Sequence, residues 1–375
     1  MTTQFQLDDL QLTLTRYPAN ANANLQAWDA ADEHLLKVIA AEPAAGSALI
    51  INDSFGALVC GLRQRQPMIQ IHWVADAKTS HLGAQENLQV NRLSGDAINW
   101  LTDEALTDVA AELTLLKLPK NLNYFAEQLK ALSQSLPAGS RILIGAKAKH
   151  INQALLALIA EHFGPASASL TWKKTRVITA IADGKARPLA PPVRWQTDEQ
   201  LTLIGMANVF AATKLDIGAR FMLQHLPQGE FKQVVDLGCG NGVLGLTAAQ
   251  RYPNASVHFV DDAYQAVSSA SLASLANSLA TERLHFHWDD CLTNLPADVA
   301  ADLVLCNPPF HQGEAITDHI AWQMFVDAKK RLQQGGMLQV VGNRHLGYHI
   351  KLKRLFGNCE TVAGNSKFVI LRATK

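Results

Sequence analysis

Short apolar runs, rich in β-branched and aromatic residues, alternate with helical patterns along the second half of this 375-residue chain. Runs of this length, bounded by turn residues, are typical of buried strands. The strands predicted in this way span residues 234–237, 256–262, 284–290, 303–306, 337–342 and 368–371. Because strands and helices alternate, we expect an α/β fold with a largely parallel sheet covered on both faces. Ligands of such sheets bind beyond the carboxyl ends of the strands. Four polar residues occur at those ends: Asp236, Asp261, Asp290 and Asn307.

The strand predicted at 234–237 leads directly into a glycine-rich turn. Gly238, Gly240 and Gly242 follow it, and an apolar helical pattern resumes at Val243. Glycine lets the backbone adopt positive φ and leaves room for a ligand to approach closely. The helix that follows directs free N–H groups at that ligand. The stretch therefore predicts a site for a nucleotide-like cofactor.

Two kinds of cofactor compete for this turn. Gly240, Gly242 and Gly245 satisfy the G-x-G-x-x-G pattern of dinucleotide sites, and an acid follows about 20 residues on, as those sites require. Asp236 argues against a dinucleotide, because a carboxylate just before the glycines would face a pyrophosphate. The same carboxylate suits a cationic or amine-bearing ligand.

A second unusual turn follows the strand predicted at 303–306, with the sequence Asn307-Pro308-Pro309-Phe310. Proline fixes φ and lacks a backbone donor, so two in succession make a stiff turn that presents acceptors. The Asn307 amide oxygen and the Pro308 carbonyl suit an NH₂ group, which has two protons to donate. Phe310 offers a face on which a planar base can stack. The turn therefore predicts a site for the amine of such a base.

The first half of the chain repeats the pattern of the second. Residues 110–119 align without gaps on residues 300–309, and Gly56 and Gly242 each precede an aspartate by the same interval. Two further glycine pairs are equally spaced, Gly139 and Gly145 matching Gly336 and Gly342. These matches occur in the same order, so they predict two copies of one fold. The alternative explanation is that two unrelated α/β units share a common strand–helix rhythm.

The first copy has lost the residues that would face a ligand at its strand ends. Asp236 aligns with Ile50 and Asn307 with Lys117, whereas the apolar strands are retained. We therefore expect residues 1–184 to bind or orient a substrate without holding a cofactor. The proline-rich residues 185–196 cannot continue a helix or a central strand, which predicts a semi-rigid linker.

Composition excludes several classes of function. The chain carries 33 basic and 33 acidic residues, so no overall field attracts it to nucleic acid, and any basic surface must be local. Its first residues lack the features of a signal peptide, and no apolar run approaches the length of a membrane span. The five cysteines are scattered without a C-x-x-C pair, which favours reduced thiols over disulfides or zinc ligands. We expect a cytoplasmic protein without metal or membrane contact.

The two turns together resemble the motifs of a known superfamily. The pattern D-x-G-x-G-x-G from Asp236 to Gly242 is similar to the first motif of class I S-adenosylmethionine-dependent methyltransferases. Asn307-Pro308-Pro309-Phe310 is similar to the signature of members that methylate planar-bound amines. Within this superfamily the chain most resembles the ribosomal RNA guanine-N2 methyltransferases, which join a non-catalytic methyltransferase-like domain to an active one. The stretches that carry this likeness, and that look most like the large-subunit members, are 307–312, 321–325, 342–346 and 356–359.

The resemblance implies two tandem Rossmann-like class I methyltransferase domains. The first, residues 1–184, would be degenerate, and the second, residues 197–375, would be the catalytic domain that binds S-adenosylmethionine. The residues implied to hold the cofactor are Asp216, Gly218, Asp236, Gly238, Gly240, Gly242, Asp261, Asp290 and Asn307. The implied catalytic residues are Asn307, Pro308, Pro309 and Phe310.

The likeness also assigns parts of the cofactor to these residues. Asp236 and the glycines would hold the methionyl end, and Asp261 would accept from the two ribose hydroxyls. Asp290 would accept from the adenine amine. Asp216 and Gly218 resemble a motif that closes over the cofactor. Asp262 and Asp289 are adjacent in sequence to two of these acids and could exchange roles with them.

The implied reaction is methyl transfer to the exocyclic N2 amine of a guanine in ribosomal RNA, 23S in preference to 16S. One alternative is methylation of a DNA adenine or a protein glutamine, which the N-P-P motif also serves. Another is a non-catalytic RNA-binding assembly factor. The degenerate first half argues against the former alternative, and intact Asp236 and Asn307 argue against the latter.

Two groups of basic residues are candidates for contacts with RNA phosphates. In the second half they are Lys329, Lys330, Arg331, Arg344, Lys351, Lys353 and Arg354. In the first half they are Arg141, Lys147, Lys149, Lys173, Lys174 and Arg176. Solvated helix faces carry similar charge runs, so both explanations stay open.

Overall fold

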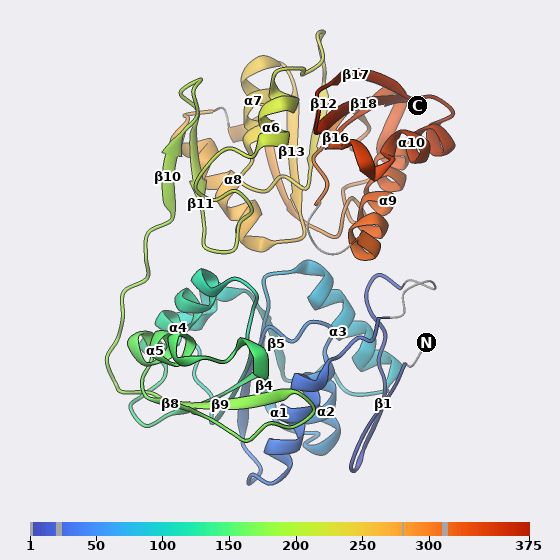
Figure 1. The fold of residues 1–375 in the computed structure, drawn as a ribbon. Coiled ribbons are helices and arrows are strands. Elements are labelled where there is room, and N and C mark those ends of the chain that lie inside the picture. Colours follow the sequence, from blue (N-terminus) through green and yellow to red (C-terminus); the bar gives the residue numbers. More distant parts are fainter. Residues whose placement is uncertain (1–2, 20–24, 280, 310–313) are drawn as a thin grey trace. The chain divides into compact units, whose positions relative to one another are not determined.

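The computed structural model describes residues 3–19, 25–279, 281–309 and 314–375, with residues 314–318 described by their backbone alone. The chain divides into two compact units, Met1–Pro191 and Pro192–Lys375 (Figure 1). Each unit contains one seven-stranded sheet and one two-stranded hairpin. The α/β class predicted from the sequence is confirmed in both units.

The first unit begins with a hairpin and continues as alternating strands and helices. Its strands are β1 Gln4–Leu7, β2 Leu10–Thr13, β3 Ser47–Ile51, β4 Gln70–Val74, β5 Ile98–Leu101, β6 Leu113–Lys117, β7 Arg141–Lys147, β8 Ala166–Ala168 and β9 Thr175–Ile181. Its α-helices are α1 Ala30–Ala40, α2 Ala57–Arg65, α3 Lys78–Val90, α4 Leu122–Ser135 and α5 Gln153–His162. The strand order of the sheet is β5-β4-β3-β6-β7-β9-β8. β3 to β7 are parallel, and β9 runs antiparallel to β7 and β8.

The second unit has the same plan. Its strands are β10 Val193–Gln196, β11 Thr202–Gly205, β12 Gln233–Leu237, β13 Ser256–Asp261, β14 Leu284–Trp288, β15 Ala301–Cys306, β16 Leu332–Asn343, β17 Glu360–Gly364 and β18 Phe368–Thr374. Its α-helices are α6 Ile217–Leu223, α7 Val243–Arg251, α8 Tyr264–Ala276, α9 Glu314–Arg331 and α10 Tyr348–Phe356. The strand order is β14-β13-β12-β15-β16-β18-β17, with β12 to β16 parallel and β18 antiparallel to β16 and β17.

The strand registers of the two sheets correspond residue by residue. Ile50 pairs with Leu115 in the first sheet, and Asp236 pairs with Leu305 in the second. Both alignments read from the sequence, Ile50 with Asp236 and Lys117 with Asn307, therefore agree with the register. The prediction of two copies of one fold is confirmed.

The match of the later glycine pairs is wrong by one residue. Leu116 pairs with Ile144 in the first sheet and Cys306 with Val340 in the second, so Gly145 corresponds to Val341. Gly139 corresponds in the same way to Gly335, and both have positive φ, 85° and 79°. Equal spacing between two glycines does not define a register. The register is set by the hydrogen bonds of each strand to its neighbours.

All six strands predicted from the sequence are present, and three strands of the second unit were missed: β10, β11 and β17. β17 was missed because its sequence, Glu360-Thr361-Val362-Ala363-Gly364, has neither an apolar run nor a clear alternation. β10 lies within residues 185–196, the predicted linker. It pairs with β11, and Trp195 donates from its indole nitrogen to the carbonyl of Ala212 at 2.9 Å.

The core of each unit consists of two layers, one on each face of the sheet. In the second unit α6, α7 and α8 pack on one face, and α9 and α10 pack on the other. Val234 belongs to the first layer, and Val235 and Leu237 belong to the second. Since side chains alternate along a strand, Asp236 points toward the face covered by α7.

Candidate functional site

The candidate site lies at the carboxyl edge of the second sheet, where β12 and β15 are neighbours. In the sheet, β13 lies on the outer side of β12, and β16 lies on the outer side of β15. The strand order therefore reverses between β12 and β15. Ligands of open α/β sheets bind at such a switch point. Leu237 pairs with Cys306, so the glycine turn after β12 and Asn307 after β15 begin side by side.

The glycine turn combines a glycine that packing requires with one that faces open space. Gly238, Gly240 and Gly242 all have left-handed backbone, with φ of 75°, 53° and 81°. At Gly242 a Cβ atom would lie 2.7 Å from the Cβ of Ala270 in α8. At Gly240 the nearest atom to such a Cβ is 4.0 Å away. The turn therefore leaves room for a ligand to approach its backbone.

Asp261, at the end of β13, fastens the glycine turn. Its Oδ2 accepts from the backbone N–H of Gly240 and its Oδ1 from that of Ala263, both at 2.9 Å. Burial raises the pKa of Asp261, and these two N–H donors oppose the rise. Each oxygen has a second lone pair for a further donor, as the predicted contact with two hydroxyls requires.

Asp236 lies beneath the start of α7 and is fully buried. Its Oδ2 accepts from the backbone N–H of Gly245 at 2.7 Å. Its pKa is raised to about 7, chiefly by burial; the Gly245 N–H opposes this rise, and the negative charge of Asp261 adds to it. Its Oδ1 is buried and has no partner among the described residues. One oxygen thus serves the fold, and the other is available to a donor.

The structure distinguishes Asp290 from its neighbour Asp289. Asp289 accepts from the backbone N–H groups of Asp290 and Asn294 and from the Asn294 side chain, at 2.7–2.8 Å. Asp290 instead faces Gln323 of α9, whose Nε2 lies 3.2 Å from both carboxylate oxygens. Burial raises the pKa of Asp290. Asp289 therefore organises its own loop, which leaves Asp290 as the acid with acceptor capacity for a ligand.

Asn307 faces Asp216, the residue that caps the N-terminus of α6. Asn307 Nδ2 donates to Asp216 Oδ2 at 3.3 Å, and the same oxygen accepts from the backbone N–H of Ala219 at 2.9 Å. The other end of the Asn307 amide, Oδ1, is buried and has no partner among the described residues. A buried acceptor without a partner costs free energy, so this oxygen is suited to a donor from a ligand.

The remaining predicted catalytic residues directly follow Asn307 in the sequence. Pro308 is buried and Pro309 is half-buried. Phe310 lies outside the described residues, as do His311 and Gln312. Gly218 lies within α6, where a Cβ would be 3.0 Å from Asp216 Oδ2 and 3.5 Å from Asn307 Oδ1. The structure therefore brings Asp216, Gly218 and Asn307 together.

Two contacts at the site were not predicted from the sequence. They involve Gln323, which donates to Asp290, and Met324, whose Cε would be 3.0 Å from a Cβ at Gly238. Both residues belong to the stretch 321–325, which contributed to the family resemblance but had no assigned role. Their helical periodicity alone predicts only packing.

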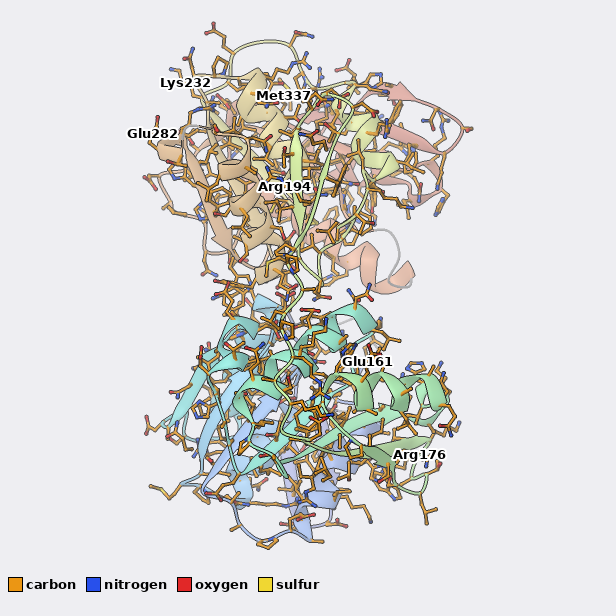
Figure 2. The ribbon with its side chains drawn as sticks, turned by 90° about the vertical axis from the view of Figure 1, so that its left-hand side faces the viewer. Glu161, Arg176, Arg194, Lys232, Glu282 and Met337 are labelled. Carbon is orange, nitrogen blue, oxygen red and sulfur yellow. The ribbon has the colours of Figure 1, made fainter. Side chains whose placement is uncertain are left out.

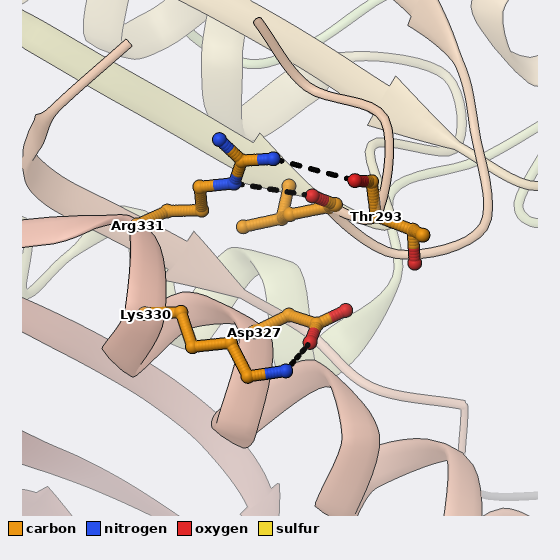
Figure 3. Close-up of a pocket in the computed structure, with 5 residues that line it drawn as sticks. Thr293, Asp327, Lys330 and Arg331 are labelled. Atoms are coloured by element: carbon orange, nitrogen blue, oxygen red, sulfur yellow. Dashed lines mark hydrogen bonds and ion pairs between the residues drawn. The ribbon is translucent and has the colours of Figure 1, made fainter. Parts of the chain in front are cut away.

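Most of the basic residues predicted to contact phosphate in the second unit have their donors engaged. Lys329 donates to the carbonyl of Leu355 at 2.6 Å, and Arg344 to that of Asn365 at 2.7 Å. Lys330 pairs with Asp327 at 3.3 Å, and Arg331 donates to nearby backbone carbonyls (Figure 3). The pocket that these two residues line with Leu292, Thr293 and Asp327 contains none of the predicted site residues.

In the first unit the corresponding basic residues divide into two groups. Arg141 pairs with Glu42 at 2.7 Å, Lys173 pairs with Glu33, and Arg176, labelled in Figure 2, donates to the carbonyls of Ser169 and Ala168. The other three side chains are exposed and make no ion pair among the described residues: Lys147, Lys149 and Lys174.

Clustered metal ligands and membrane-spanning helices are both absent from the described part of the chain. No group of three His, Cys, Asp or Glu side chains there could hold a metal ion. No helix there is long and apolar enough to cross a membrane.

Protein-family models match both halves of the chain: an RLMG N-terminal domain over residues 2–184 and a methyltransferase small domain over residues 200–372. Two similar curated proteins are named ribosomal RNA large subunit methyltransferase G, from Shewanella sp. (strain W3-18-1) at 59% identity and Shewanella oneidensis at 60%. Both alignments cover 100% of this chain and 100% of the relative. A solved T. thermophilus 16S rRNA N2 methyltransferase, in complex with AdoMet and guanosine, is 23% identical with a TM-score of 0.79. That alignment covers 100% of this chain and 97% of the other, and it concerns the fold alone.

Proposed function

The chain belongs to the ribosomal RNA large subunit methyltransferase G family, and from this premise we propose that it methylates the exocyclic N2 amine of a guanine in 23S rRNA. The methyl donor is S-adenosylmethionine, which supplies an electrophilic methyl group on a positively charged sulfur. The site in the second unit would bind both molecules, and ribosomal RNA as substrate implies a cytoplasmic enzyme.

The observation that carries the proposal is the buried, partnerless Oδ1 of Asn307 among the described residues. An amide oxygen accepts hydrogen bonds, and the exocyclic amine of guanine has two N–H groups to donate. We propose that Asn307 Oδ1 and the Pro308 carbonyl accept one each. Two such bonds favour a pyramidal nitrogen whose lone pair points at the methyl carbon. Alignment of this kind supplies effective molarities on the order of 10⁵ M or more.

The step needs no strong base. The new N–C bond forms as the C–S bond breaks, and the electron pair of that bond stays on sulfur. The nitrogen gains a methyl group and loses one proton to solvent. The residues of this chain hold and orient the amine, and Phe310 would contribute a stacking face for the base.

The cofactor residues fit a ligand that carries an amine and a ribose. Asp236 Oδ1 is a buried acceptor without a partner among the described residues, and Gly240 faces open space. We propose that Asp236 and the glycines hold the methionyl end, that Asp261 accepts from the ribose and that Asp290 accepts from the adenine amine. Asp216 and Gly218 complete the proposed site beside Asn307.

The large ribosomal subunit is favoured over the small one by the relatives named above, which are about 60% identical over the full chain. The 16S enzyme shares the fold at 23% identity, so its substrate is the second candidate for this chain.

We propose that residues 1–184 bind and orient the RNA through Lys147, Lys149 and Lys174. Lys147 ends β7, Lys149 lies in the 3₁₀-helix Ala148–His150, and Lys174 precedes β9. The backbone N–H of Ala148 donates to the Lys174 carbonyl at 2.9 Å, which joins the two segments. Three exposed ammonium groups on joined segments suit a phosphate backbone.

The test is transfer of a tritiated methyl group to protein-free 23S and 16S rRNA by the wild type and by Asn307→Ala. We expect label in 23S rRNA with the wild type and transfer slowed by about 10²-fold or more with the variant. Label in DNA or in a protein, with neither rRNA labelled, would contradict the proposal. RNA binding without any methyl transfer would instead indicate an assembly factor.

A further inference from the structure

The amide of Asn307 has two ends of opposite hydrogen-bonding character. The oxygen accepts, and the NH₂ group donates. The proposed reaction requires the oxygen to face the substrate amine, because a donor facing a donor would repel it. Something in the site must therefore fix which way the amide points.

Asp216 is the neighbour that selects the orientation. Its Oδ2 lies 3.3 Å from Asn307 Nδ2. An ionised carboxylate only accepts hydrogen bonds, so only the NH₂ end of the amide can face it. The oxygen end is then directed away from Asp216, where it is buried and without a partner among the described residues.

Asp216 is itself held in place. The oxygen that meets Asn307 also accepts from the backbone N–H of Ala219 at 2.9 Å, as the N-cap of α6. A Cβ at Gly218 would lie 3.0 Å from that oxygen and 3.5 Å from Asn307 Oδ1. The glycine leaves both atoms the room that this arrangement needs.

The first unit contains the same arrangement with the chemistry removed. Asp29 caps α1, and its Oδ1 accepts from the backbone N–H of Ala31 at 2.8 Å. Lys117, at the position of Asn307, has its Nζ 3.2 Å from that same oxygen. The donor to the capping aspartate is thus present in both units, and only the second unit adds an acceptor.

We propose that Asp216 is a positioning residue for methyl transfer, which holds the NH₂ end of Asn307 so that its oxygen grips the amine of the target base. This assigns Asp216 to the substrate side of the site instead of to the cofactor. The proposal rests on the proposed function and specifies how the catalytic amide is oriented.

Two substitutions at position 216 separate these roles. Serine and asparagine both cap helices well, so both variants should fold. In Asp216→Ser the shorter side chain caps α6 but does not reach Asn307. In Asp216→Asn the amide oxygen can still accept from both Ala219 and Asn307. The control is Asp198→Asn, which removes an exposed carboxylate that pairs with Arg220 of the same helix at 2.6 Å.

We expect Asp216→Ser to lower kcat on 23S rRNA by about 10²-fold while KM for both substrates stays within about threefold. Asp216→Asn should recover most of that loss, and Asp198→Asn should match the wild type. Gly218→Ala, which crowds the same contact from the other side, should lower kcat on the order of tenfold. Melting temperatures should stay close to that of the wild type.

A rise in KM for S-adenosylmethionine with unchanged kcat, in both variants at position 216, would make Asp216 a cofactor ligand and overturn the proposal. Full activity of Asp216→Ser would overturn it as well. If Asn307→Ala also keeps full activity, the proposed role of the Asn307 amide fails as well, and the proposed function itself fails only if the wild type labels neither rRNA. If Asn307→Ala is inactive and Asp216→Ser is not, only the positioning role fails.

Discussion

The two units of this chain share a sheet and differ in chemistry. Gly56 and Gly242 both have left-handed backbone at the start of a helix, and a Cβ at either would lie within 2.8 Å of an alanine Cβ, that of Ala84 or Ala270. Such positions are retained because the packing of two helices depends on them. The strand-end residue, by contrast, is Lys117 in one unit and Asn307 in the other. The residues that helix packing requires are therefore the same in both units, whereas the strand-end residue beside the candidate site differs between them.

In the first unit, Lys117 occupies the position that the second unit leaves open for a ligand. Its buried ammonium lies 2.7 Å from Asp32 and 3.2 Å from Asp29. Burial alone would lower the pKa of Lys117, but these carboxylates raise it above its ordinary value. An ammonium has three donors and no acceptor, so this position cannot grip an amine.

The carboxylate beneath the central helix shows a second difference. In the first unit Asp53 accepts from the backbone N–H of Val59 at 2.9 Å, and in the second Asp236 accepts from that of Gly245 at 2.7 Å. Val59 and Gly245 are equivalent, but Asp53 and Asp236 are not. Both units thus place a carboxylate below this helix, but the carboxylate comes from different sequence positions in the two units.

The largest effect should come from making the second unit resemble the first. In Asn307→Lys the ammonium can pair with Asp216, as Lys117 pairs with Asp29, and the acceptor is lost. We expect methyl transfer to fall by about 10³-fold or more, measured with tritiated S-adenosylmethionine. Circular dichroism should show a folded protein. An active variant would mean that the Asn307 amide oxygen is not the cause of the difference in activity between the two units.

Breaking the ion pair of the first unit should destabilise it. In Lys117→Ala the buried Asp32 loses its partner, and we expect a loss of about 3–5 kcal/mol in the free energy of unfolding, measured in urea. Burial raises the pKa of Asp32 to about 6 even with Lys117 present. The lone carboxyl can therefore take up a proton, and the loss should be smaller at pH 5 than at pH 8. An equal loss at both values would argue against a buried pair.

Asp236→Asn should change how stability depends on pH. Burial raises the pKa of Asp236 from its ordinary value of 3.8 to about 7 in the folded protein. The folded state thus binds a proton that the unfolded state has released, so wild-type stability falls as the pH rises from about 4 to about 7. The variant lacks this slope and should gain on the order of 2 kcal/mol over the wild type between pH 5 and pH 8. Parallel profiles from urea melts would contradict this, and Asp198→Asn serves as the control.

The smallest effect should follow from changing the basic surface of the first unit. Replacing Lys147, Lys149 and Lys174 by alanine should raise KM for rRNA roughly tenfold and leave kcat nearly unchanged. The slope of log K against log salt should fall by about 2, since each phosphate contact contributes about 0.7–0.9. Arg141→Ala, which removes a residue paired with Glu42, should leave the salt slope unchanged. An unaltered slope in the triple variant would exclude this surface.

The sequence predicts the fold and the position of the candidate site because periodicity and turn chemistry are local. The apolar runs predict six strands of the second unit, and the polar residues at their ends predict the edge where Asp261 and Asn307 lie. The duplication is visible because the two units retain the same packing positions.

The contacts within the site could not be predicted, because they depend on how distant segments meet. Asp216 and Asn307 are 91 residues apart in sequence. Asp289 and Asp290 are both acids at a strand end, and only the geometry of the loop shows which one is engaged by its own backbone. The pairing of Lys330 with Asp327, or of Arg141 with Glu42, likewise follows from tertiary structure.

A crystal structure with S-adenosylhomocysteine and guanosine tests most directly whether the amide of the second unit grips the base. We expect both compounds in the second unit, with guanine N2 within about 3.2 Å of Asn307 Oδ1 and Asn307 Nδ2 still facing Asp216. Binding of S-adenosylhomocysteine in the first unit, or a guanine amine remote from Asn307, would contradict the account.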